Sequence, residues 1–189
     1  MHNKLPAFFT FVDTFENDHI RKLDKKIAII YRNYEKGLDK KLIIKIKKIC
    51  KKDGRKFYLS NNIKIAINLD LDGVYLPSFN KNLNFNKNNL RTKFIIIGSA
   101  HSVKQIKVKE SQGVKMIFLS PIFKTKKSNF FLNTIKFNTL AAKSKKKVIA
   151  LGGITSKNLK KLKLTKAFGF AGISYFKNNN KIINWNERS

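Results

Sequence analysis

Short apolar runs typical of β-strands alternate with lysine-rich helical segments along almost the whole chain. This alternation is the pattern of βα units, in which each helix carries the chain back to begin the next parallel strand. Several of the strand segments are apolar at every position, as expected for strands that are covered on both faces. The pattern therefore restricts the chain to an α/β fold built on a parallel sheet.

Eight strand segments are expected, at 7–12, 27–31, 56–59, 73–76, 93–97, 116–119, 148–151 and 170–174. Helical segments are expected at 18–25, 39–52, 63–69, 87–92, 103–112, 136–143 and 156–166, with a last stretch at 180–186. Eight units in 189 residues predict a small (β/α)8 TIM barrel, and an open doubly wound sheet is the alternative that the pattern alone leaves open. Because no linker or internal repeat interrupts the chain, we expect 1–189 to be a single domain, with 79–89 as a loop.

The formal net charge of +30 raises the question of nucleic-acid binding. The lysines are spread along the chain, mostly on the expected outer faces of helices, and Lys, Asn, Ile and Phe are abundant together, as in products of genomes rich in A and T. No nucleic-acid motif and no interleaving of aromatic with basic residues occurs. The charge is therefore interpreted as solvated surface, which would attract small phosphorylated ligands.

The only cysteine, Cys50, lies in a run whose apolar residues recur at helical spacing, so we expect it in the core. A lone cysteine forms no intramolecular disulfide or zinc cluster, which fits a cytoplasmic protein. The apolar segment 5–12 ends at Asp13 and predicts a first strand rather than a signal peptide. No apolar stretch approaches the roughly 20 residues of a membrane-spanning helix, so no membrane contact is expected.

In a (β/α)8 barrel the active site is built from the loops that follow the strands. These loops are uncharged or basic, and Asp13 is their one clear carboxylate: they comprise Asp13, Arg32, 60–62, 77–80, 99–101, 120–128, 152–155 and Ser174. Hard cations such as magnesium prefer carboxylate oxygens. The loops therefore predict an anion site rather than a metal site.

Two of these loops favour phosphate in particular. The seventh strand ends in Gly152-Gly153, and glycines let a phosphate approach the backbone N–H groups closely. The turn 171–174 follows the eighth strand, and the loops after the seventh and eighth strands are the recurrent phosphate site of such barrels. A tight strand-to-helix turn is the alternative explanation of the glycine pair.

The chain resembles the thiamine phosphate synthase/TenI family from about residue 5 to about residue 176. The resemblance is carried by five segments in family order and spacing, which are Asp72-Gly73-Val74-Tyr75-Leu76, Ser99-Ala100-His101, Ser120-Pro121-Ile122-Phe123-Lys124-Thr125, Ala150-Leu151-Gly152-Gly153-Ile154 and Gly172-Ile173-Ser174. It implies a TIM barrel of thiamine biosynthesis and a transferase that joins an aminopyrimidine diphosphate to a thiazole phosphate. In that family diphosphate leaves first, with magnesium and basic groups offsetting its charge, and the thiazole nitrogen captures the pyrimidine cation.

The thiazole-phosphate half of the family site is kept. The resemblance places Thr125, Gly153, Ile173 and Ser174 on phosphate-contact positions. It places Ser99 on a diphosphate contact. These five residues are therefore expected to bind a phosphorylated thiamine precursor.

The diphosphate half departs from the family pattern. Asn61 and Asn80 stand where the family has its two magnesium-binding aspartates, so no cofactor is firmly expected and magnesium is in doubt. Arg32 keeps a family arginine. Ser128 stands where the family has its loop lysine, so that lysine survives only as a neighbour, in Lys126-Lys127. We expect Arg32, Asn61 and Lys127 to contact the ligand. TenI tautomerases use a histidine where this chain has Pro121, so that activity is not implied.

Several individual residues have both a structural and a functional interpretation. Arg32 and His101 are the catalytic candidates, although His101 also fits a loop histidine held by local hydrogen bonds. Asp13 fits either a ligand contact or a helix cap, His19 a surface residue, and Trp185 an anchor for a last helix. Three functions stay open: a thiamine-pathway enzyme, a non-catalytic barrel that binds a phosphorylated precursor, and, least favoured, a nucleic-acid-binding protein. The oligomeric state stays open as well.

Overall fold

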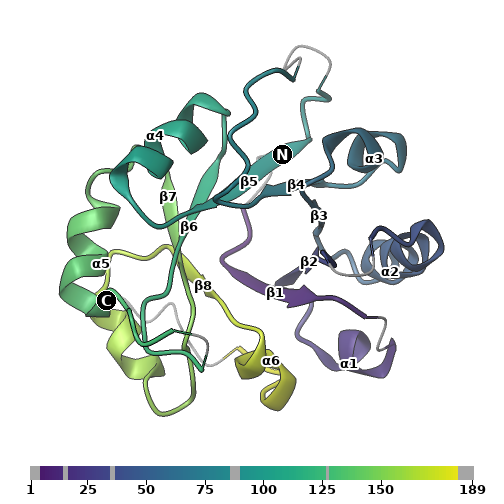
Figure 1. Ribbon diagram of the computed structural model, residues 1–189. Helices are drawn as coiled ribbons and strands as arrows, with labels where there is room; N and C mark the ends of the chain where they lie inside the picture. The colour runs from purple at the N-terminus through teal and green to yellow at the C-terminus, as the bar shows by residue number, and fades with distance from the viewer. Residues whose placement is uncertain (1–4, 15–16, 35–36, 86–89, 127, 183–189) are drawn as a thin grey trace.

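The computed structural model describes residues 5–14, 17–34, 37–85, 90–126 and 128–182. They form a closed barrel of eight parallel strands, in which each strand pairs with the next along the chain and the last pairs with the first (Figure 1). The strands are β1 (Phe8–Val12), β2 (Ile27–Tyr31), β3 (Phe57–Ser60), β4 (Gly73–Leu76), β5 (Ile95–Ala100), β6 (Met116–Leu119), β7 (Lys147–Leu151) and β8 (Gly169–Ala171). The prediction of a (β/α)8 barrel is confirmed, and the open sheet is excluded.

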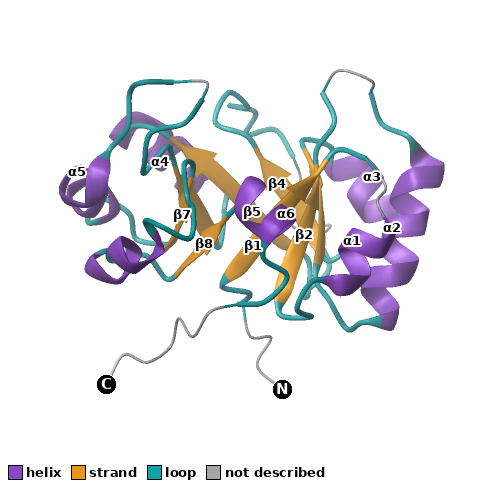
Figure 2. Cartoon of the chain, turned by 90° about the horizontal axis from the view of Figure 1, so that it is seen from below, coloured by secondary structure: helices purple, strands orange, loops and turns teal. Residues whose placement is uncertain are grey.

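Helices surround the barrel and return the chain to the start of the next strand (Figure 1). They are α1 (Asn17–Lys22), α2 (Lys40–Lys52), α3 (Ile63–Asn68), α4 (Val103–Ser111), α5 (Asn133–Ala141), the 3-10 helix η2 (Leu159–Leu164) and α6 (Ser174–Asn178). In the part of the chain that the structure describes, none of them is long and apolar enough to cross a membrane. The loops that follow the strands gather at one side of the barrel, along the upper edge of Figure 2.

Four expected elements differ in the structure. The segment 156–166 contains only the short 3-10 helix η2, and 90–92, the described part of the expected helix at 87–92, is not helical. The last strand ends at Ala171, and Ser174 begins α6 instead of ending the strand. Tyr175 and Phe176 explain this change, because both are buried against Phe170 and only a helical turn brings both rings there. Residues 180–182 are not helical, and 183–186, with Trp185, lie outside the described residues.

Aromatic rings fill the interior of the barrel. Phe9 and Phe11 of β1 meet Phe118 of β6, with ring centroids 4.9 Å and 6.4 Å apart, and Tyr75 of β4 lies 5.2 Å from Phe11. These rings pack edge to face, the arrangement that the aromatic quadrupole favours. They close the barrel and form a floor beneath the loops at its carboxyl end.

A second apolar layer lies between the strands and the helices. Helix α2 begins at Asp39, whose Oδ1 accepts a hydrogen bond from the Leu42 N–H at 3.1 Å, and it buries Ile43, Ile46 and Cys50. Cys50 is thus in the core, as expected, and burial raises the pKa of its thiol to about 12. The thiol is therefore protonated and unreactive at physiological pH.

Candidate functional site

The expected site residues lie at the carboxyl end of the strands. The structure places there Asp13, Arg32, Asn61, Asn80, His101, Thr125, Gly153, Ile173 and Ser174. Ser99 is the exception in burial, because it lies within β5 and is 4% exposed. Lys127 lies outside the described residues. The barrel thus brings together residues that are far apart in the sequence.

Two consecutive glycines shape the loop after β7. Gly152 has φ +94° and Gly153 has φ +70°, in the left-handed region that residues with a Cβ disfavour. A Cβ added at Gly153 would lie 2.4 Å from the carbonyl oxygens of both Phe123 and Lys124. The loop after β6 is therefore packed directly on this glycine. No larger residue fits at Gly153 without moving that backbone.

The loops after β7 and β8 lie side by side and present free backbone donors. Leu151 pairs with Ala171 at the end of the two strands, so Gly153 and Ile173 each lie two residues beyond a shared rung. Within the described residues, the N–H groups of Gly153, Ile173 and Ser174 donate to no other protein group. The Gly153 carbonyl is turned away and accepts from Asn158 Nδ2 at 2.8 Å. Such neighbouring N–H groups form an anion-binding concavity.

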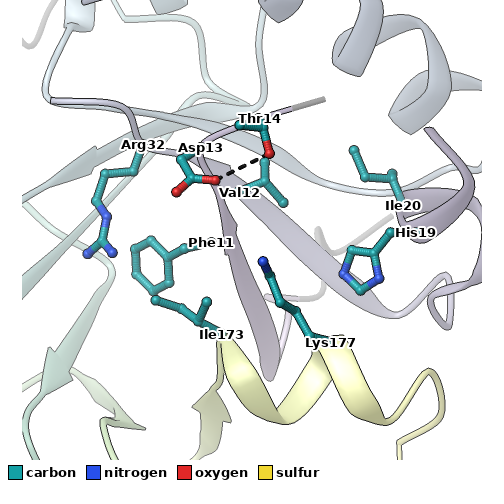
Figure 3. Close-up of a pocket in the computed structure, with 9 residues that line it drawn as sticks. All are labelled: Phe11, Val12, Asp13, Thr14, His19, Ile20, Arg32, Ile173 and Lys177. Carbon is teal, nitrogen blue, oxygen red and sulfur yellow. Dashed lines mark hydrogen bonds between the residues drawn. The ribbon is translucent and has the colours of Figure 1, made fainter. Parts of the chain in front are cut away.

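A cavity of about 50 Å³ lies beside these loops, between the ends of β1 and β2 and the start of α6 (Figure 3). Arg32 and Lys177 bring two positive charges to it, and Ile173 lines it as well. The guanidinium of Arg32 lies 4.6 Å from the ring centroid of Phe11, a cation–π contact that fixes its position. The cavity therefore places positive charge beside the free N–H groups of these loops.

Two acid–base residues of this cavity were only partly predicted. Asp13 lines it and accepts a hydrogen bond from the hydroxyl of Thr14 at 3.4 Å. His19, interpreted from the sequence as a surface residue, is partly buried and also lines the cavity. Sequence reasoning could not place His19 at this cavity, because only the fold of α1 brings it beside β1 (Figure 3).

An exposed aromatic pair lies at the ends of β2 and β4. Tyr34 is 50% exposed and Phe79 is 60% exposed, and their ring centroids are 5.7 Å apart. The Tyr34 hydroxyl shares a hydrogen bond of 2.8 Å with Ser60 Oγ at the end of β3. Sequence reasoning missed this pair. The available signal was an aromatic residue in a polar loop directly after a strand.

Asn61 and Asn80 meet at the ends of β3 and β4. Asn80 Nδ2 donates to Asn61 Oδ1 at 2.7 Å, and Asn80 Oδ1 accepts from the Asn82 N–H at 3.0 Å. Asn61 has φ +60°, which asparagine tolerates better than most residues. The two positions that the resemblance assigned to magnesium therefore form an amide pair.

His101 is oriented by its neighbours. Its Nδ1 lies 2.7 Å from the carbonyl oxygen of Ser120, and its backbone N–H donates to Gln105 Oε1 at 2.7 Å. A carbonyl oxygen only accepts, so Nδ1 carries a proton. In the neutral imidazole, Nε2 is then the acceptor, at the carboxyl end of β5.

The hydroxyls of Ser99 and Thr125 are already engaged. Ser99 shares a hydrogen bond with the phenol of Tyr75, whose pKa burial raises to about 12. Thr125 Oγ1 accepts from the Ser128 N–H at 3.1 Å. A ligand would reach Thr125 at the surface of its turn, whereas Ser99 lies beneath the mouth of the barrel.

A metal ion finds few ligands here. Among the described residues, no three His, Cys, Asp or Glu side chains gather closely enough to hold one. The amide pair offers neutral oxygens that already accept hydrogen bonds. Asp13 is the one carboxylate that the sequence analysis identified in the loops after the strands, and it lines the cavity. The donor set of the described residues therefore does not fit magnesium.

Comparisons with known proteins agree on one family. The family model described as thiamine monophosphate synthase matches residues 22–176. The chain is 34% identical to a putative thiamine-phosphate synthase 2 of Aquifex aeolicus, over 88% of this chain and 89% of that protein. It is 32% identical to a thiamine-phosphate synthase of Pelagibacter ubique, over 95% of this chain and 87% of that protein. A solved thiamine phosphate pyrophosphorylase of Pyrococcus furiosus matches with a TM-score of 0.73 at 20% identity, covering 89% of this chain and 86% of that one, and supports the fold.

Proposed function

The chain belongs to the thiamine monophosphate synthase family, and from this premise we propose that it binds a thiazole phosphate at the carboxyl end of its barrel. Family membership places it in thiamine biosynthesis. The relatives named above are thiamine-phosphate synthases, whose substrates are phosphorylated thiamine precursors. The whole chain, in this proposal, is one barrel domain that serves one ligand site.

The observation that carries the proposal is the pair of loops after β7 and β8. Their N–H groups at Gly153, Ile173 and Ser174 are free in the described residues and lie beyond the same rung of the sheet. A phosphate monoester supplies the acceptor oxygens that these donors lack. Arg32 and Lys177 in the adjoining cavity add the positive charge that favours a dianion.

The second precursor, an aminopyrimidine diphosphate, would lie on the side of β2 to β5. We assign Arg32 and Asn61 on that side, together with Lys126 and Lys127 from the loop after β6, to its phosphates, and Lys127 is placed by sequence alone. Departure of diphosphate builds negative charge, which the Arg32 fork and a lysine ammonium offset directly. No step is assigned to magnesium, because the residues present do not fit it.

His101 and Arg32 are the two residues that we assign to chemistry. Arg32 would stabilise the leaving diphosphate, because its guanidinium is held at the mouth by Phe11. His101 would act as an acceptor through Nε2, the nitrogen that is unprotonated in the neutral imidazole when Nδ1 donates to Ser120. A barrel that binds both precursors without joining them is the alternative function, and it differs only in the absence of product.

Binding of thiazole phosphate to Gly153→Ala tests the proposal. The added Cβ would collide with two carbonyl oxygens and displace the loop, so calorimetry should show an affinity roughly tenfold or more below that of the wild type. Gly54→Ala is the matched control, because Gly54 has a similar φ of +66° and open space around it. Unchanged affinity in a folded Gly153→Ala protein would contradict the proposal.

A further inference from the structure

Helix α4 buries a lysine that has no acidic partner among the residues that the structure describes. Lys109 is 0% exposed, and its Nζ donates to Gln112 Oε1 at 2.9 Å and to the carbonyl oxygen of Asn80 at 2.7 Å. Both acceptors are neutral. Desolvation lowers the pKa of Lys109 to about 8, so at neutral pH the side chain is still mostly an ammonium. A buried positive charge therefore lies directly beneath the loop that follows β4.

The barrel makes room for this lysine at Gly98 of β5. A Cβ at Gly98 would lie 2.9 Å from Lys109 Cδ and 3.0 Å from the carbonyl oxygen of Leu76. Burying an ammonium without a carboxylate costs free energy, which its hydrogen bonds offset only in part. The Lys109 side chain thus fills the space left by Gly98, close to the candidate site, although burying its charge costs free energy.

The ammonium fixes the orientation of the neighbouring amide. An ammonium only donates, so the atom of Gln112 that faces Lys109 is the oxygen. The NH2 group of Gln112 must then face the other way. It donates to the carbonyl oxygen of Asn82 at 2.9 Å, to that of Asn80 at 3.2 Å and to Asn80 Oδ1 at 3.1 Å.

The orientation of Gln112 in turn fixes the amide orientations of Asn80 and Asn61. Asn80 Oδ1 accepts from Gln112 Nε2 and from the Asn82 N–H, which only donate, so its orientation is fixed as well. Its NH2 group therefore faces Asn61 and donates to Oδ1 at 2.7 Å. Asn61 Nδ2 is left over, and within the described residues it donates to no protein group.

We propose that Lys109 and Gln112 are positioning residues that turn the Asn80–Asn61 pair into a hydrogen-bond donor for a diphosphate oxygen, without a metal ion. The proposal rests on the proposed function, since it assumes a phosphorylated ligand at this end of the barrel. A cation would need the opposite orientation, with amide oxygens directed outward. The buried ammonium excludes that orientation as long as the chain of hydrogen bonds is intact.

Inorganic pyrophosphate is the probe, and calorimetry in the presence of a chelator is the measurement. The wild type should bind pyrophosphate with the same affinity in chelator and in magnesium. Asn80→Asp replaces the donating NH2 by an acceptor, so Asn61 must turn its own NH2 inward to meet it. Affinity in chelator should fall roughly tenfold, and magnesium should restore it. This exchange of metal dependence is not expected from a loss of packing.

Two variants on α4 separate positioning from packing. Gln112→Glu keeps the acceptor for Lys109 but lacks the NH2 that holds Asn80, and Lys109→Met removes the ammonium. Each should weaken pyrophosphate binding in chelator by roughly tenfold. Lys104→Met is the control, because it removes the same charge from an exposed position on the same helix. It should leave the affinity nearly unchanged.

Thiazole phosphate distinguishes failure of this inference from failure of the proposed function. Its affinity should depend on Gly153 and be unaffected by Asn80→Asp or Gln112→Glu. Loss of that dependence on Gly153 would reject the proposed function. The inference is overturned by wild-type pyrophosphate binding that requires magnesium, or by affinities in chelator that are the same in wild type, Asn80→Asp and Gln112→Glu.

Discussion

In the proposed function, the two sides of the barrel mouth bind anions with different kinds of donor. At the ends of β7 and β8 the donors are backbone N–H groups, held in place by glycines at positive φ. At the ends of β3 and β4 the donors are side-chain amides, and a lysine buried beneath them sets their orientation. Backbone donors cannot reverse, whereas an amide can turn to present either an oxygen or an NH2 group. The first side is therefore fixed by local conformation, and the second depends on a network.

The largest expected effect is a loss of stability when the backbone of the loop after β7 is disturbed at Gly153. Gly153→Ala should lower the free energy of unfolding by about 2 kcal/mol or more, because it adds a collision with two carbonyl oxygens to the cost of positive φ. Gly54→Ala carries the conformational cost alone and should lose about 1 kcal/mol. Denaturant unfolding of both variants measures the difference. Equal losses would show that the loop after β6 does not pack on Gly153.

An intermediate effect is expected when the Asn61–Asn80 pair is converted into a metal site. Asn61→Asp combined with Asn80→Asp supplies two carboxylates at neighbouring strand ends, and the positive φ of Asn61 is no obstacle because Asp also adopts it. Magnesium affinity, measured by calorimetry, should rise at least roughly tenfold above that of the wild type. A wild type that binds magnesium as tightly as the double variant would contradict the account of the amide pair.

The smallest expected effect is a pH dependence of stability that comes from Lys109, beneath the Asn61–Asn80 pair. The pKa of Lys109 is lowered by desolvation to about 8 in the folded protein, whereas an unfolded lysine titrates near 10.4. Between these values the unfolded chain binds more protons, so stability rises with pH. The free energy of unfolding of the wild type should therefore increase relative to Lys109→Met from pH 8 to pH 10.5. A difference between the two proteins that does not change with pH would count against a buried ammonium.

The same contrast explains what the sequence could predict. Strand positions followed from apolar runs, and the Gly152-Gly153 turn was visible because glycine is the residue that positive φ and close approach demand. The short helix α6 was missed because the burial of Tyr175 and Phe176 against Phe170 is a tertiary effect.

Lys109 was hidden among many surface lysines. It lies three residues after the buried Ile106, on the inner face of α4, and this helical spacing was the only local signal of its burial. Its role depends on Gly98, Gln112 and the loop after β4, which come together only in the folded barrel. The substitutions at 61 and 80 were visible in the sequence, but the direction in which their amides point was not.

Independence from magnesium is the central claim about this chain. The direct measurement supplies the aminopyrimidine diphosphate and the thiazole phosphate to the purified wild type, with magnesium and with a chelator. Product formation and binding of the diphosphate should be the same in both conditions, because in the proposed function Arg32, the loop lysines and the Asn61 amide offset its charge in place of the metal. Robust product formation that disappears when magnesium is chelated would contradict the claim.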